Sequence, residues 1–164
     1  PLTEFLPAEV QLNPQGYIIT DEKMASNLEG FFAAGDVRAK YLRQVVTAAS
    51  DGAIAAVAAE KYVHETELWE KEVINSKKPV LVAYYNPTDM SGTEKIGLVD
   101  RFVRANNERF SLVKVDATRN ELVGRRYNIT LDQLPKLHVF FNGEIKHEAA
   151  EINENNLTAI NNLF

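Results

Sequence analysis

The stretch from Lys78 to Gly92, KPVLVAYYNPTDMSG, contains the clearest signal for the fold. Its first part, residues 79–85, is an apolar and aromatic run that starts at a proline, which is typical of a buried β-strand. The part that follows, residues 86–92, is rich in turn-forming residues and leads into a segment with helical spacing of apolar residues. The stretch therefore predicts a core strand that passes through a turn into a helix.

The rest of the second half, from about residue 66 onward, continues to alternate between helix and strand patterns. The predicted helices cover residues 67–75, 91–107, 120–126 and 153–163, and the predicted strands cover residues 79–85, 110–115, 136–141 and 144–147. Asn142-Gly143, between the last two strands, is a two-residue hairpin signal. This order predicts an α/β fold with a mixed sheet flanked by helices on both faces.

This half resembles thioredoxin from about residue 67 to residue 164. The resemblance is carried by KPVLV at residues 78–82, by Leu134-Pro135, and by a strand that ends in FFNG at residues 140–143. It implies a thioredoxin-like domain over residues 65–164, in which Pro135 is the family's cis-proline that helps to hold a bound peptide. A longer segment before Pro135, and Lys136 in place of a small hydroxyl residue, depart from the family, so Leu131 is instead expected to be an exposed contact.

The thioredoxin resemblance also places the family's two redox cysteines on positions that are not cysteine here. They fall on Asp89 and Gly92, with Met90 and Ser91 between them, and the chain contains no Cys. Ala83 stands where the family often carries a buried acid. Because thiol–disulfide exchange needs a thiolate, the resemblance implies a redox-inactive domain.

Asp89 itself has two interpretations. Beside a predicted helix N-terminus it suits an N-cap, with the backbone of Gly92 or Thr93 nearby. The alternative is a functional carboxylate that meets an anion or a metal ion. The N-cap is the more economical interpretation.

The first half contains a long helical pattern over residues 43–64, with seven alanines between residues 48 and 59. Its larger apolar residues recur with helical spacing, at Val46, Ala49, Ala53, Ile54 and Val57. So many small residues on one helix indicate the close approach of another backbone or of a flat ligand. Residues 17–20 and the apolar run at residues 31–34 are strand candidates.

The string FAAGDVR at residues 32–38, followed by YLRQVVTAASDGAIAA at residues 41–56, resembles the C-terminal FAD-binding segment of low-molecular-weight thioredoxin reductases. The resemblance extends over residues 1–64. It implies an incomplete C-terminal segment of a Rossmann-like FAD-binding domain. Because such a segment lacks most of its sheet, its alanine-rich helix is expected to expose an apolar face.

Within this resemblance, Gly35, Asp36, Arg43, Gln44 and Val45 are the candidate FAD-binding residues. Gly35 allows close backbone approach to the ribityl chain, and the carboxylate of Asp36 accepts a hydrogen bond from a ribityl hydroxyl. Unpaired N–H groups at the helix N-terminus, near Gln44 and Val45, stabilise negative charge on the flavin. Taken alone, Asp36 has a plainer interpretation as a turn or N-cap residue.

The chain has no Gly-x-Gly-x-x-Gly phosphate turn and does not begin with Met. The expectation is therefore a C-terminal fragment of an FAD- and NADPH-dependent disulfide oxidoreductase, with the NADPH site outside the chain. The fragment alone is expected to be inactive, with its thioredoxin-like domain serving for docking or regulation. A related possibility is a flavoenzyme that reduces ferredoxin or another acceptor, and the alternative from another class is a non-enzymatic protein-binding module.

The composition excludes several classes of binding partner and of functional site. The 164 residues carry a formal net charge of −5, which argues against binding to nucleic acid or to anionic membranes. Without cysteine there is no disulfide, Cys-ligated metal centre or Cys nucleophile, and three scattered His argue against a His-rich metal site. No apolar run approaches about 20 residues. The sequence thus predicts a cytoplasmic protein with a protein partner and a possible homodimer through the alanine-rich helix.

Overall fold

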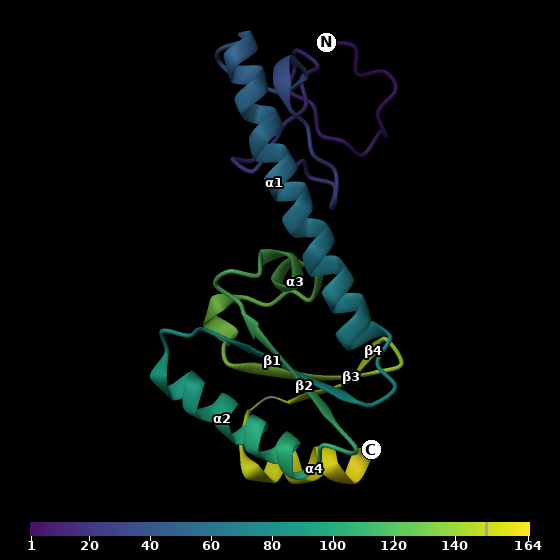
Figure 1. Ribbon diagram of the computed structural model, residues 1–164, viewed down its shortest axis with the longest axis vertical. Coiled ribbons are helices and arrows are strands. Elements are labelled where there is room, and N and C mark those ends of the chain that lie inside the picture. Colours follow the sequence, from purple (N-terminus) through teal and green to yellow (C-terminus); the bar gives the residue numbers. More distant parts are fainter. Residues whose placement is uncertain (150) are drawn as a thin grey trace. The chain divides into compact units, whose positions relative to one another are not determined.

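The computed structural model describes residues 1–149 and 151–164 (Figure 1). Its internal contacts divide the chain into two compact units, Pro1–Glu65 and Thr66–Phe164. The second unit holds two buried apolar clusters, and the first holds a smaller one. Among the described residues, no helix combines the length and apolar character needed to cross a membrane.

The second unit is built on a four-stranded mixed sheet with the strand order β2-β1-β3-β4. The strands are β1 (Val80–Tyr85), β2 (Ser111–Asp116), β3 (Lys136–Phe141) and β4 (Glu144–Ala149). β1 pairs in parallel with β2 and antiparallel with β3, and β3 pairs antiparallel with β4. The mixed sheet that the sequence predicts is confirmed.

Two features of the sequence explain this sheet. β1 is central, and residues 80–84 are fully buried on both faces, which accounts for its unbroken apolar run. Between β3 and β4, Asn142 and Gly143 have φ values of 53° and 77°, the left-handed conformation that a tight two-residue hairpin requires. The predicted hairpin is confirmed.

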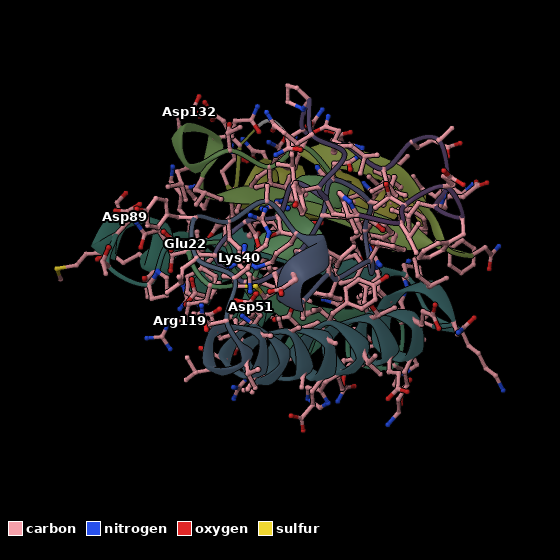
Figure 2. All side chains as sticks on the ribbon, turned by 90° about the horizontal axis from the view of Figure 1, so that it is seen from above. Glu22, Lys40, Asp51, Asp89, Arg119 and Asp132 are labelled. Atoms are coloured by element: carbon pink, nitrogen blue, oxygen red, sulfur yellow. The ribbon has the colours of Figure 1, made fainter. Side chains whose placement is uncertain are left out.

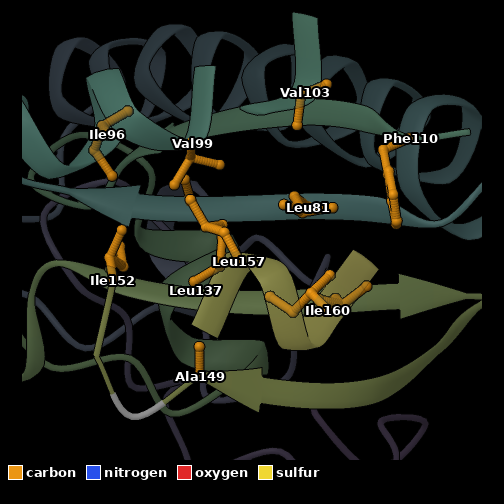
Figure 3. Close-up of a cluster of buried hydrophobic side chains, with 12 residues drawn as sticks. Leu81, Ile96, Val99, Val103, Phe110, Leu137, Ala149, Ile152, Leu157 and Ile160 are labelled. Atoms are coloured by element: carbon orange, nitrogen blue, oxygen red, sulfur yellow. The ribbon is translucent and has the colours of Figure 1, made fainter. Parts of the chain in front are cut away.

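Helices cover both faces of the sheet (Figure 1). α2 (Met90–Ala105) and α4 (Glu154–Leu163) pack on one face, where Leu81 and Leu137 meet Val99, Leu157 and Ile160 in the main core (Figure 3). The other face buries side chains from β1, β3 and the short helix α3 (Glu121–Arg126), together with Trp69 from the end of the long helix.

The long helix α1 runs from Val45 to Trp69 and continues as a π-helical turn over Glu70–Ile74. The sequence predicted a helix that ends at residue 64 and a separate helix at 67–75, and this was wrong. No glycine or proline occurs between residues 53 and 78, so nothing in the sequence interrupts the helix before Pro79.

The first unit contains little regular structure apart from α1. The strand candidates at residues 17–20 and 31–34 form only isolated bridges, Ile18 with Leu12 and Arg38, and Phe32 with Ala25. The prediction of strands was wrong, because these single bridges do not make the continuous ladder of hydrogen bonds that a strand forms with its neighbour. The small core consists of Val10, Ile18 and Ala33.

The larger apolar residues that recur along α1 lie on its exposed side. Val46, Ile54 and Val57 are 73%, 40% and 67% exposed, whereas the half-buried and buried positions lie on the opposite side of the helix. That inner side consists of Ala48, Asp51, Ala55, Ala58, Ala59 and Tyr62. The small residues therefore face the first unit, and an apolar face is left exposed, as expected for a segment that lacks its sheet.

Candidate functional site

The first candidate site is the turn that follows residues 31–34. Gly35–Val37 form one turn of 3-10 helix, and Gly35 has a φ of 81°, a conformation that favours glycine. A Cβ atom at Gly35 would lie 3.8 Å from the Cβ of Ala48 on α1. The backbone conformation therefore accounts for the glycine, whereas the small side chain of Ala48 leaves room for the turn beside α1.

Asp36 projects from this turn. Its side chain is 60% exposed, and its Oδ1 lies 3.4 Å from Nζ of Lys40. The carboxylate is thus accessible to a ligand, and the buried ammonium group of Lys40 lies on its inner side. Its role toward a ribityl hydroxyl stays a prediction.

The other three FAD candidates lie where the chain enters α1. The guanidinium carbon of Arg43 stacks 3.8 Å from the ring centroid of Tyr17. Val45 is the first residue of α1 and is 88% exposed. The N–H of Gln44, however, donates to Oγ1 of Thr47 at 3.1 Å, so it is not one of the unpaired groups that the sequence suggested. As at any helix N-terminus, the first N–H groups of α1 have no acceptor within the helix and lie at the positive end of its dipole.

This turn is anchored on Asp51, a residue that was not predicted from the sequence. Asp51 is 6% exposed, and its carboxylate accepts hydrogen bonds from the N–H of Gly35, from Arg38 and from Lys40. The hydrogen bond from Arg38, helped by Lys40, holds the pKa of Asp51 far below its usual range although burial acts in the opposite direction. A lone acid within an alanine-rich helix is the signal that could have revealed it.

The second candidate site lies at the N-terminus of α2, where thioredoxins carry their cysteines. Asp89 is the N-cap: its carboxylate accepts from the N–H of Ser91 at 3.1 Å and from the N–H of Gly92 at 3.0 Å (Figure 2 labels Asp89). Thr93 adds a hydrogen bond from its hydroxyl to the carbonyl oxygen of Asp89 at 2.8 Å. The N-cap interpretation is confirmed.

Other residues that the thioredoxin resemblance assigns to this site have the expected local features. The Leu134–Pro135 peptide bond is cis, as the resemblance implies. Met90 is 81% exposed, and Leu131, in a short 3-10 turn (Leu131–Gln133), is 64% exposed as predicted. Within the described residues no group of three His, Asp or Glu side chains gathers as a metal site.

A buried polar pair, Tyr84 and His138, lies on the other face of the sheet and was not predicted from the sequence. His138 of β3 is 1% exposed and its ring meets the ring of Tyr84 of β1 edge-on at 5.1 Å. Nε2 of His138 lies 3.4 Å from Oε2 of Glu148 without hydrogen-bond geometry. Burial lowers the pKa of His138 and raises that of Tyr84. A histidine inside the apolar strand KLHVFF was the available signal.

These observations define the class of protein: a thioredoxin-fold unit whose redox positions hold a capping aspartate and a glycine, preceded by a turn-and-helix segment. The family model described as thioredoxin matches residues 60–162, which is more than half of the chain, so this chain belongs to the thioredoxin family. The model described as pyridine nucleotide-disulphide oxidoreductase matches residues 1–52. The chain is therefore a reductase-type segment followed by a thioredoxin domain.

Individual proteins agree with this division. The thioredoxin reductase of Peptoclostridium litorale is 57% identical over 65 residues, which are 40% of this chain and 21% of that protein. A 34.2 kDa protein in a rubredoxin operon of Clostridium pasteurianum is 54% identical over 63 residues, 38% of this chain and 20% of that protein. The chain thus spans about a fifth of the length of these relatives.

A solved structure supports the thioredoxin fold. The germline-specific thioredoxin Deadhead of Drosophila melanogaster superposes with a TM-score of 0.51 at 16% sequence identity, covering 64% of this chain and 93% of that protein. At this level of identity the likeness concerns the fold alone.

Proposed function

We propose that this chain is the C-terminal part of an FAD- and NADPH-dependent, thioredoxin reductase-like disulfide oxidoreductase. The observation that carries the proposal is the 57% identity of its reductase-type segment to a thioredoxin reductase. The pyridine nucleotide-disulphide oxidoreductase family, which generally binds FAD, matches the same region. The NADPH site and the phosphate-binding turn lie outside this chain.

The residues of the first unit fit the ribityl and pyrimidine parts of FAD. The glycine turn allows close backbone approach, and the exposed carboxylate of Asp36 is an acceptor for a hydroxyl group. The N-terminal turn of α1, beginning at Val45, presents the positive end of a 25-residue helix to developing negative charge. FAD, when bound, supplies the two-electron redox chemistry.

The thioredoxin domain is proposed to be redox-inactive. Its helix N-terminus is capped by a carboxylate, and no residue of the chain supplies a thiol. The domain then serves to dock a partner protein or to regulate the reductase. The lack of cysteine is also in keeping with the reducing cytoplasm, which is the proposed location.

The test begins with the sequence upstream of the codon for Pro1. The complete polypeptide, expressed and purified, is expected to show flavin absorbance and to oxidise NADPH. A colourless protein without a Gly-x-Gly-x-x-Gly segment would contradict the proposal. The 164-residue chain is the matched control, and it is expected to reduce no disulfide of insulin.

A second candidate function is a non-enzymatic protein-binding module. The observation that favours it is the exposure of two large apolar side chains, Met90 and Leu131, at the positions that follow from the thioredoxin resemblance. In a pull-down, Leu131→Ser is expected to lose a bound protein that Leu163→Ser retains, because Leu163 is equally exposed but lies on α4. Equal recovery by both variants would count against this surface.

A further inference from the structure

Asp51 is a charged group in a place where an apolar residue would be expected. It lies on the inner face of α1 between Ala48 and Ala55, and only 6% of it is exposed. Burying a carboxylate costs several kcal/mol unless its charge is compensated and its oxygens accept hydrogen bonds. The reason for an acid at this position therefore lies in its partners.

All of these partners come from the segment between residues 35 and 40. Arg38 donates from Nε to Oδ2 at 2.8 Å and from Nη2 to Oδ1 at 3.2 Å, which is a two-point, charge-assisted contact. The N–H of Gly35 donates to Oδ2 at 3.1 Å, and Nζ of Lys40 donates to the same oxygen at 3.0 Å. A single carboxylate thus holds the turn at both of its ends.

Asp36 lies between these anchors and shares one of them. Nζ of Lys40 is 3.0 Å from Asp51 Oδ2 and 3.4 Å from Asp36 Oδ1, and Figure 2 shows Lys40 and Asp51 side by side. The side chains of Lys40 and Asp51 are each 8% exposed, whereas that of Asp36 is 60% exposed. The ammonium group is therefore held on the buried side, by the nearer carboxylate.

We propose that Asp51 is a positioning residue for Asp36: it fixes the turn and retains Lys40, so that the carboxylate of Asp36 stays available to a ligand hydroxyl. The proposal rests on the proposed FAD-binding function for the identity of that ligand. The four charges of Asp36, Arg38, Lys40 and Asp51 sum to zero, so removal of Asp51 leaves an excess of positive charge next to Asp36. Lys40 then pairs with Asp36 instead.

The first test uses the 164-residue chain without flavin. Nuclear magnetic resonance coupling across the hydrogen bond, from the ammonium nitrogen of Lys40 to a carboxyl carbon, identifies its acceptor. The expected acceptor is Asp51 in the wild type and in Asp36→Asn, and Asp36 in Asp51→Asn. Asp21→Asn is the matched control, because Asp21 is an exposed turn-capping acid of the same unit. It is expected to change nothing.

Two results would overturn the proposal in this test. One is coupling of Lys40 to Asp36 in the wild type, and the other is an Asp51→Asn variant in which Lys40 does not move to Asp36. If Asp51→Asn does not fold, the wild type and Asp36→Asn still test the proposal, because it requires that Lys40 keeps Asp51 as its acceptor in both proteins.

The second test uses the complete flavoprotein. Asp51→Asn is expected to weaken FAD binding by about tenfold, which matches the loss of roughly one charge-assisted hydrogen bond. The double variant Asp51→Asn/Lys40→Met is expected to recover part of that affinity, since no ammonium group is then left to pair with Asp36. If the wild type binds FAD and the Asp51→Asn variant binds it with equal affinity, the positioning role alone is overturned. A wild type that binds no FAD would instead contradict the proposed function.

Discussion

Oδ2 of Asp89 lies 2.6 Å from the point where a Cβ atom on Gly92 would stand. Real Cβ atoms essentially never come so close to another atom, so the capping carboxylate occupies the space that any side chain at position 92 needs. The two positions that hold cysteines in thioredoxins are therefore coupled here in a different way. The aspartate needs the glycine, and this pair stabilises the start of α2 without any redox chemistry.

A double-mutant cycle on this pair should show the coupling. Asp89→Ala is expected to lower the free energy of unfolding by about 1 kcal/mol through loss of the N-cap. Gly92→Ala is expected to be nearly neutral, because a gain in helix propensity of about 1 kcal/mol offsets the displaced cap. In the Gly92→Ala background, Asp89→Ala should then cost almost nothing.

The cycle is measured by urea unfolding at neutral pH. Asn153→Ala, which removes the N-cap of α4, is the matched control and should combine additively with Gly92→Ala. If Asp89→Ala and Gly92→Ala also combine additively, the cap does not depend on the glycine.

The same geometry leads to a prediction of gained function. Asp89→Cys/Gly92→Cys removes the blocking carboxylate and places two thiols at the N-terminus of an α-helix, where the dipole favours the thiolate. We expect this variant, unlike the wild type, to catalyse reduction of insulin disulfides by dithiothreitol. Asp89→Cys alone, without a resolving thiol, should remain inactive.

A folded double variant with two titratable thiols and no activity would show that more than two residues separate this domain from an active thioredoxin. The departures at Ala83 and Lys136 would then become the next positions to change.

Replacement of two glycines of the first unit by alanine should change the stability of this unit in opposite directions. At Gly30, which has a φ of 77°, a Cβ would lie 2.9 Å from Oη of Tyr62. Gly30→Ala therefore combines left-handed strain of about 1 kcal/mol with displacement of a packed ring. At Gly52 in α1 a Cβ meets nothing within 4 Å, so Gly52→Ala should stabilise the unit by about 1 kcal/mol.

Hydrogen exchange of the amides in residues 1–65 measures both effects separately from the second unit. Faster exchange in Gly30→Ala and slower exchange in Gly52→Ala are expected. Equal behaviour of the two variants would mean that the packing of Tyr62 against the Gly30 turn does not limit the stability of this unit.

The sequence predicted the second unit well because its signals are local and agree with one another. The continuous apolar run of β1, the hairpin at Asn142-Gly143 and the cap at Asp89 each favour one local structure, and together they agree with a mixed sheet flanked by helices. The first unit was harder. Which face of α1 is buried depends on long-range partners, and among the described residues the larger apolar side chains of this helix are exposed.

The anchor at Asp51 shows why the site was only partly predictable. Asp36 lies in a recognisable turn string, so its place in the site follows from local sequence. Asp51 is fifteen positions further along and acts through contacts with Arg38 and Lys40 that no spacing rule supplies. A buried charge network is a property of tertiary packing, and a single sequence shows only its isolated members.

Mild acid should weaken the second unit through His138. Burial lowers the pKa of His138 in the folded state below its usual value of 6.5, although Glu148 opposes this effect. Well above pH 6.5, His138 is neutral in the folded and in the unfolded state, so a change in pH does not alter the free energy of unfolding through this residue. As the pH falls below 6.5 the unfolded chain binds the proton first, so stability is lost with decreasing pH.

Urea unfolding between pH 7.5 and pH 5 tests this prediction. His138→Leu removes the buried nitrogens that make no hydrogen bond among the described residues, so we expect it to be more stable by about 1 kcal/mol at pH 7.5 and less sensitive to acid. Glu148→Gln removes the carboxylate that favours protonated His138, and it should make the loss below pH 6.5 steeper. Identical pH profiles for the wild type and His138→Leu would show that another group controls the response to acid.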